Sequence, residues 1–364
     1  MASDVTGLRL KTAFTGAYAR KAIAEGRAEY LPWRLFHAPR LFLRHFQPDV
    51  ALVQLSEMDR RGVHSLGVEV ACKRVIGATP VIIAEVNPQM PHTFGDTRIG
   101  NSRLNDLVPV NYQIHQMSTD ANNPETGQIA KNVAELVPDQ ATIQIGIGAI
   151  PDAVVRELRY HKDLGLHTEV LSTQILDLVE SGALTGAFKK NHVGKMVATI
   201  LLGTDPLYRF VHNNPDFEMY PAEITNDPAL VAQEERFFAI NGALHVDLTG
   251  QVNACSLGQR MVSGVGGQLD MMEGAAFSHS GMPIIAMPST ATVKGDRRSR
   301  IVCSLPEGSG VTTPRYVGVT VVTEFGHAVL EGLSARERAK ALIGIAHPEH
   351  QEILRKQAKD VGLL

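Results

Sequence analysis

The chain has 364 residues, of which 44% are hydrophobic and 20% are charged, and its formal net charge is −3 at pH 7. This is the composition of a globular protein with enough apolar residues for one large domain or two. The small negative charge argues against nucleic acid or an anionic membrane surface as a partner.

The N-terminal region and the cysteines indicate where the protein is expected to work. Asp4 and the lack of an apolar core near the N-terminus argue against a secretory signal, and no apolar run approaches the ~18 residues that span a membrane. Cys72, Cys255 and Cys303 form no CxxC pair, so neither a zinc site nor a disulfide framework is expected. A reducing, cytoplasmic location fits this pattern best.

Short apolar runs alternate with amphipathic helical patterns along the chain. The runs read as buried strands are DVALVQLS (49–56), TPVIIAEV (79–86), ATIQIGIG (141–148), GKMVATILLG (194–203) and MPIIAMPS (282–289). Helices are expected over 153–165 and 334–346. This alternation predicts an α/β fold with parallel sheets. The turn-rich segment 118–127 is the best domain boundary, which divides the chain into 1–122 and 126–364.

A glycine turn follows the predicted strand at 141–148. Gly146, Ile147 and Gly148 lead into a helix that begins near Pro151. Glycines at such a turn let backbone N–H groups approach an anion, with the helix N-terminus behind them, so phosphate or oxyanion binding is one interpretation. A tight strand–helix connection without a ligand is the other, because a lone GxG is a weak signal.

Glu169 in GLHTEVLS (165–172) has several possible roles at this point. It lies 21 residues after Gly148, about where the acid of a dinucleotide-binding fold holds a ribose. The dinucleotide fingerprint fails, however, because Pro151 occupies the position of its third glycine. This segment alone therefore does not decide whether Glu169 is a nucleophile, a ribose anchor or a solvated carboxylate.

A second glycine loop favours a thioester over a nicotinamide. Gly264, Gly266 and Gly267 precede another buried strand. A redox enzyme needs one such loop for its cofactor. Two loops suit a thioester substrate with a long phosphorylated group better than a nicotinamide cofactor. One loop can bind the phosphorylated group, and the other can supply backbone amides to a developing oxyanion.

Other motifs point more weakly to function. One basic cluster is interpreted as part of a solvated loop, with an anion-binding loop as the alternative; it consists of Lys294, Arg297, Arg298 and Arg300. HPEH (347–350) is a poor metal motif because HExxH is absent, and Glu324 is read as a structural strand end. No metal and no cofactor are expected.

With these residues assembled, the chain resembles the acetyl-CoA hydrolase/transferase family, and within it the 4-hydroxybutyrate and butyryl-CoA:acetate CoA-transferases. The resemblance runs from about Ala13 to Gln357 and is densest in GIGAIPDAV, LGLHTEV, SGVGGQLD, VVTEFG and IAHPEH. It implies two open α/β domains with the active site between them. It also implies that the N-terminal domain is incomplete, because the strands and helices that normally open it are missing.

The resemblance also assigns roles to individual residues. Glu169, in the context His167-Thr168-Glu169-Val170, matches the nucleophile that forms a glutamyl-CoA thioester. The coenzyme A contacts that it implies are Gly146, Ile147, Gly148, Ala149, Ile150, Asn241 and Gly264. Gly266 and Gly267 are expected to support the loop that holds the oxyanion.

This sequence departs from the family pattern beside the nucleophile and beside the second loop. Ser172-Thr173-Gln174 replaces a serine-aspartate-glycine sequence, so the turn after Glu169 is expected to differ. Met271 and Glu273 replace phenylalanine and arginine, and Glu273 reverses a charge near the loop.

The expected activity is transfer of CoA from an acyl-CoA to a small carboxylate. Acetyl-CoA and a short acyl or hydroxyacyl acid are the expected substrates. The alternatives are an acyl-CoA hydrolase that uses the same glutamate and a non-catalytic nucleotide-binding descendant. A homodimer is also expected, because residues 31–46 are rich in Trp, Phe and Leu and would be covered by a second copy. The alternative for this segment is an internal helix that folds back on its own domain.

Overall fold

The computed structural model describes residues 7–118 and 124–364. Its largest sheet has six strands in the order β10-β9-β15-β20-β24-β25. They are β10 (Gly165–Leu166), β9 (Thr142–Ile145), β15 (Phe237–Asn241), β20 (Met282–Ala286), β24 (Thr320–Thr323) and β25 (Gly326–Val329). All neighbouring pairs are parallel except β24 with β25. The predicted α/β fold with parallel strands is confirmed.

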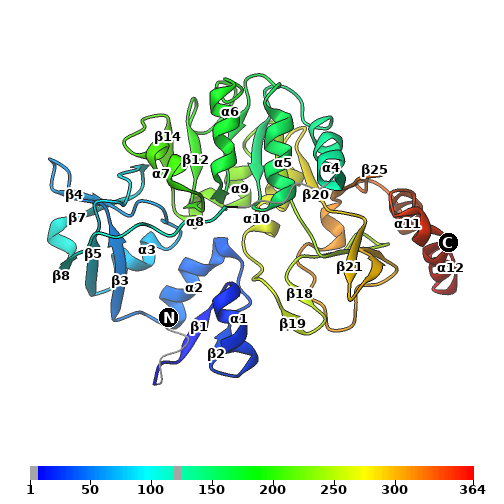
Figure 1. Cartoon of the computed structure of the whole chain (residues 1–364), viewed down its shortest axis with the longest axis horizontal. Coiled ribbons are helices and arrows are strands. Elements are labelled where there is room, and N and C mark those ends of the chain that lie inside the picture. The colour runs from blue at the N-terminus through cyan, green and yellow to red at the C-terminus, as the bar shows by residue number, and fades with distance from the viewer. Residues whose placement is uncertain (1–6, 119–123) are drawn as a thin grey trace.

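Helices cover this sheet and extend beyond it (Figure 1). They are α4 (Pro124–Ala134), α5 (Ala149–Leu158), α10 (Gln268–Phe277), α11 (Ala335–Gly344) and α12 (Pro348–Asp360). In α11, Ser334 and Glu337 form a capping box that satisfies free N–H groups at the helix start. None of the described helices is long and apolar enough to cross a membrane.

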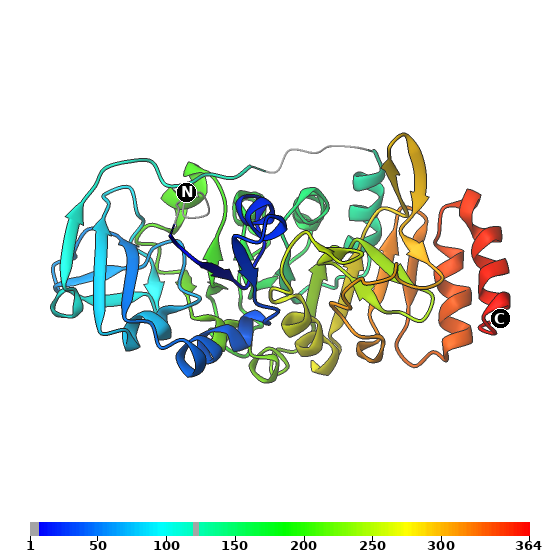
Figure 2. The same ribbon diagram turned by 90° about the horizontal axis from the view of Figure 1, so that it is seen from below.

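A second, three-stranded parallel sheet lies at the opposite end of the molecule from α11 and α12 (Figures 1 and 2). Its strands are β3 (Val50–Leu55), β5 (Val81–Val86) and β8 (Asp106–Pro109), in that order. The prediction that β3 is a fully buried strand is wrong, because Leu52 is 78% exposed. Its pattern is apolar on both faces, yet the described residues cover only one of them.

The segment 194–203 also differs from its prediction as one strand. It forms β12 (Met196–Ala198) and β13 (Ile200–Leu201), which belong to different small sheets. β12 pairs with β14 (Phe217–Met219), which in turn pairs with β6 (Phe94–Gly95). β13 pairs with β11 (Val170–Leu171), which directly follows Glu169.

The apolar core has two parts that do not follow the predicted domains. The first joins residues such as Leu55 and Ile82 to Ile143 and Leu171, and the second gathers residues between 231 and 358. The pairing of β6 with β14 likewise joins residues on both sides of 122–126. The division into 1–122 and 126–364 stays a prediction.

The aromatic segment 31–46 folds back onto the protein. It contains β-bridge residue Arg34, a short 3₁₀ helix (Leu35–His37) and α2 (Ala38–His45). The Leu35 N–H donates to the carbonyl of Gly266 at 3.0 Å, so the segment is anchored to the second glycine loop. The contact lies outside the segment's own predicted domain, and in α2 only Ala38 and Pro39 are buried, so the homodimer and its alternative both stay predictions. The fold does bring N-terminal residues to the predicted site.

Candidate active site

Glu169 lies between the large sheet and the small β11–β13 sheet, and its backbone is fixed on both sides. The N–H of Thr168 donates to Val197, and the N–H groups of Thr199 and Ile200 donate to the carbonyl of Glu169. The hydroxyl of Thr168, which is buried, donates to the carbonyl of Ile145 at 3.1 Å. The nucleophile candidate is therefore held at the carboxyl end of β9.

The carboxylate of Glu169 is held by two donors. Asn226 donates from Nδ2 to Oε2 at 2.9 Å, and the backbone N–H of Gly267 also donates to the carboxylate. A Cβ atom at Gly267 would collide with Oε2 of Glu169 and with Asn226 Nδ2. Glycine is therefore required here so that the loop backbone can reach the carboxylate.

Burial is the main reason why the pKa of Glu169 rises to about 7. The nearby charge of Asp270 raises this pKa further, whereas the hydrogen bonds from Asn226 and Gly267 lower it. The neighbouring imidazole of His167 is neutral, because burial lowers its pKa to about 3. The contact of its Nε2 with the carbonyl of Thr225, at 2.7 Å, opposes this shift only in part.

Glu169 lines a cavity of about 570 Å³, a size that suits a small-molecule site. Gly146, Ile147, Asn241, Gly264, Gly266 and Gly267 line the same cavity. The structure thus brings the nucleophile candidate together with both glycine loops. A smaller cavity of about 160 Å³ beside Leu166 and Asn214 has none of the predicted site residues in its wall.

Gly148, Ala149 and Ile150 do not line this cavity. They form the start of α5, and Gly148 has φ +125°, a conformation that glycine adopts at little cost. Pro151 is accommodated in the first turn of the helix, where backbone N–H groups have no partner within the helix. The assignment of Gly148, Ala149 and Ile150 as coenzyme A contacts stays a prediction.

Asn241 is held by a residue that the sequence analysis did not single out. Its Nδ2 donates to Oε1 of Gln144 at 2.7 Å, while Gln144 Nε2 lies 3.4 Å from Asn241 Oδ1. Gln144 is a buried polar residue within β9. A polar side chain in an otherwise apolar strand was the one sequence signal for this contact.

N-terminal residues complete the cavity wall. Ala13, Phe14, Trp33 and Leu35 line it together with the glycine loops. A Cβ atom at Gly264 would come within 2.9 Å of Phe14 Cα, so this loop packs tightly on the N-terminal segment.

Both sequence departures are accommodated by ordinary contacts. Ser172 has an extended backbone and donates to Asp152 at 2.9 Å, and Thr173–Ile175 forms a 3₁₀ helix. Neither Thr173 nor Gln174 is among the non-glycine residues with positive φ in the described chain. Glu273 accepts from Arg34 at 2.7 Å, so its negative charge is paired.

The remaining sequence motifs have structural contacts. Glu324 accepts from the backbone and hydroxyl of Ser289, which ties the ends of β24 and β20 together. His347 caps α12. Within the described residues, no group of three or more His, Cys, Asp or Glu side chains is placed to hold a metal ion.

Comparisons with known proteins agree with this arrangement. Residues 2–121 match the model of the acetyl-CoA hydrolase/transferase N-terminal domain, and residues 203–358 match that of the C-terminal domain. A fold of two CoA-transferase domains defines the class of protein. The chain belongs to the acetyl-CoA hydrolase/transferase family and is a CoA-transferase.

Individual relatives are similar over nearly the whole chain. A succinyl-CoA:acetate/propanoyl-CoA:succinate CoA transferase from Fasciola hepatica is 44% identical over 98% of this chain and 76% of its own length. A 4-hydroxybutyrate coenzyme A transferase from Clostridium kluyveri is 42% identical over 95% of this chain and 81% of its own. The crystal structure of RipA from Yersinia pestis has a TM-score of 0.93 and 35% identity, covering 98% of this chain and 82% of that one. The incomplete N-terminal domain stays a prediction.

Proposed function

We propose that the protein transfers CoA from an acyl-CoA to a small carboxylate through a covalent thioester between CoA and Glu169. The observation that carries this proposal is the position of Glu169, a buried carboxylate held by Asn226 and Gly267 in a cavity of about 570 Å³. Two of the similar proteins are named for succinate, acetate, propanoate or 4-hydroxybutyrate. Acetyl-CoA and a short acyl or hydroxyacyl acid are the substrates that we propose here.

The first half of the reaction loads CoA onto the enzyme. Ionised Glu169 attacks the thioester carbonyl of the acyl-CoA, and CoA leaves as the thiolate, which gives a mixed anhydride of the acyl group and Glu169. The thiolate then attacks the glutamyl carbonyl carbon. The acid leaves as its carboxylate, and Glu169 becomes a thioester of CoA. The acceptor acid runs these steps in reverse.

The donors to the Glu169 carboxylate have a second role in this scheme. When the thiolate attacks the glutamyl carbonyl, negative charge develops on the carboxyl group that Asn226 and Gly267 already contact. Donors in place before the charge appears stabilise the transition state, and one such donor typically contributes ~3 kcal/mol. The Gly264–Gly267 loop is proposed to serve the oxyanion of the substrate as well.

An acceptor test separates transfer from hydrolysis. Butyryl-CoA is incubated with the protein with and without acetate, and the CoA species are resolved chromatographically. We expect acetyl-CoA to form only when acetate is present, by ping-pong kinetics, and the variant Glu169→Ala to be inactive. Free CoA released at the same rate with and without acetate would identify a hydrolase. No consumption of butyryl-CoA or acetyl-CoA would support a non-catalytic descendant.

A further inference from the structure

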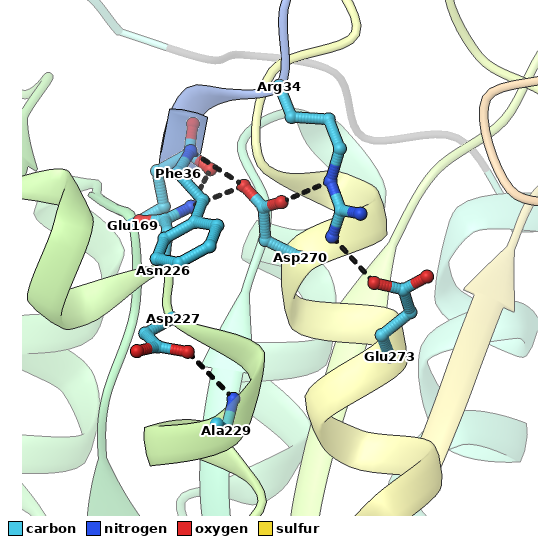
Figure 3. A network of polar contacts seen from close by, with 8 residues as sticks. All are labelled: Arg34, Phe36, Glu169, Asn226, Asp227, Ala229, Asp270 and Glu273. Carbon is cyan, nitrogen blue, oxygen red and sulfur yellow. Dashed lines mark hydrogen bonds and ion pairs between the residues drawn. The ribbon is translucent and has the colours of Figure 1, made fainter. Parts of the chain in front are cut away.

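Behind Glu169 lies a second buried carboxylate that the proposed reaction does not use. Asp270 in the first turn of α10 is fully buried. Its Oδ1 accepts from Arg34 Nε at 2.6 Å, and its Oδ2 accepts from the backbone N–H of Phe36 at 3.1 Å. Figure 3 shows these contacts, with Asp270 between Arg34 on one side and Asn226 on the other.

Asn226 connects the two carboxylates. Its Nδ2 donates to Glu169 Oε2 at 2.9 Å and lies 3.5 Å from Asp270 Oδ2. An amide nitrogen has two hydrogens, so both carboxylates can be served at once. Rotating the amide by half a turn would place Oδ1 against two carboxylates. The acceptor Oδ1 itself has no partner among the described residues, so Glu169 and Asp270 together favour the observed orientation.

We propose that Asp270, anchored by Arg34, is a positioning residue that keeps the amino group of Asn226 directed at Glu169. This inference rests on the proposed function, because it assigns a role within the same reaction. In this proposal the segment around Arg34 also positions catalytic groups, because residues 34–36 contact both Asp270 and the Gly266 carbonyl.

The groups around Glu169 determine its pKa and therefore how the reaction rate depends on pH. Asp270 is the charged group that raises the pKa of Glu169. Arg34 contacts Asp270 and Glu273, and His167 on the other side is neutral. Removing the charge of Asp270 alone would lower the pKa of Glu169. Turning Asn226 away removes a hydrogen bond that lowers this pKa by more, so in Asp270→Asn the acidic limb of the rate profile should move to higher pH.

The test compares Asp270→Asn, Arg34→Met and the double variant by steady-state kinetics with butyryl-CoA and acetate. A carboxylate misplaced by ~1 Å loses about 10²-fold in rate, so we expect kcat of Asp270→Asn to fall by about that factor while KM for butyryl-CoA changes less than about twofold. The double variant should lose no more than Asp270→Asn alone, because Arg34 acts through Asp270.

The control is Glu273→Gln, which removes the other partner of Arg34 from the same helix and should keep the wild-type kcat and pH profile. If Asp270→Asn does not fold, as judged by circular dichroism, Arg34→Met carries the test, because the Arg34 side chain is 22% exposed. Arg34→Lys should recover part of its lost kcat. An unshifted acidic limb and wild-type kcat in Asp270→Asn, or wild-type kcat in Arg34→Met, would overturn the inference. An inactive wild-type protein would overturn the proposed function instead.

Discussion

At the scale of single residues, the proposed reaction needs an ionised Glu169, yet this residue lies where ionisation is unfavourable. Burial and the charge of Asp270 raise its pKa to about 7, so the proposed nucleophile titrates near neutral pH. Asn226 and Gly267 stabilise the ionised form and fix its position. A raised pKa also makes the carboxylate more nucleophilic once it has lost its proton.

Stability should report this raised pKa independently of activity. The ordinary pKa of 4.5 applies in the unfolded chain, so between about 4.5 and 7 the folded protein binds more protons, and Glu169 makes the fold less stable as pH rises. Glu169→Gln removes this penalty. Its denaturant midpoint should exceed that of the wild type by more at pH 8 than at pH 4.5, and an equal difference at both pH values would contradict the raised pKa.

Only part of this site could be predicted from the sequence. Glu169 and the glycine loops stand in recognisable local patterns. Asn226 and Arg34 do not, because their roles depend on contacts with residues 57 and 236 positions away. From the sequence, Glu273 could be described only as a reversed charge near the loop, because its partner Arg34 lies in a distant segment.

At the scale of elements, the turn before α10 brings the backbone of the second glycine loop against the carboxylate. Gly267→Ala would place a methyl group where Oε2 of Glu169 and Nδ2 of Asn226 lie. We expect kcat to fall by about 10²-fold, as for a ~1 Å displacement of the carboxylate. The matched control is Gly127→Ala in α4, where a Cβ atom meets nothing within 4 Å and should leave the kinetics unchanged. Equal kinetics for the two variants would show that the loop does not position Glu169.

The apolar pattern predicted a strand's range correctly where the whole apolar run belongs to one sheet. β9 and β20 lie within their predicted ranges, because their residues are buried in the middle of the large sheet. The run 194–203 is equally apolar but divides between two small sheets at Thr199, whose hydroxyl donates to Tyr220. Periodicity does not reveal which neighbour a strand pairs with.

At the scale of the whole molecule, the three-stranded sheet leaves open one face that carries apolar residues beside the polar Gln54 and Glu85. Val50 and Leu52 on β3 and Val108 on β8 are exposed, although parallel sheets are usually covered on both faces. The segment 31–46 folds back on the protein but leaves Phe46 exposed, so a homodimer that covers it stays a prediction. The open sheet face is a second place that a copy of the chain could cover.

Light scattering tests the dimer directly. We expect a two-fold dimer at micromolar concentration, and Leu52→Lys should shift it toward monomer because a charge in an apolar interface is unfavourable. Glu352→Lys, on the exposed surface of α12, serves as the control for an added lysine. A wild-type protein that scatters as a monomer would contradict the prediction.

The most direct measurement for the central claim is the intact mass of the protein after incubation with butyryl-CoA alone, without an acceptor acid. The account predicts an increase equal to one CoA less one water, located on the peptide that contains Glu169. The adduct should disappear when acetate is added and should not form in Glu169→Ala. Butyryl-CoA turnover by the Glu169→Ala variant, or an adduct on another residue, would contradict the assignment of Glu169 as the nucleophile.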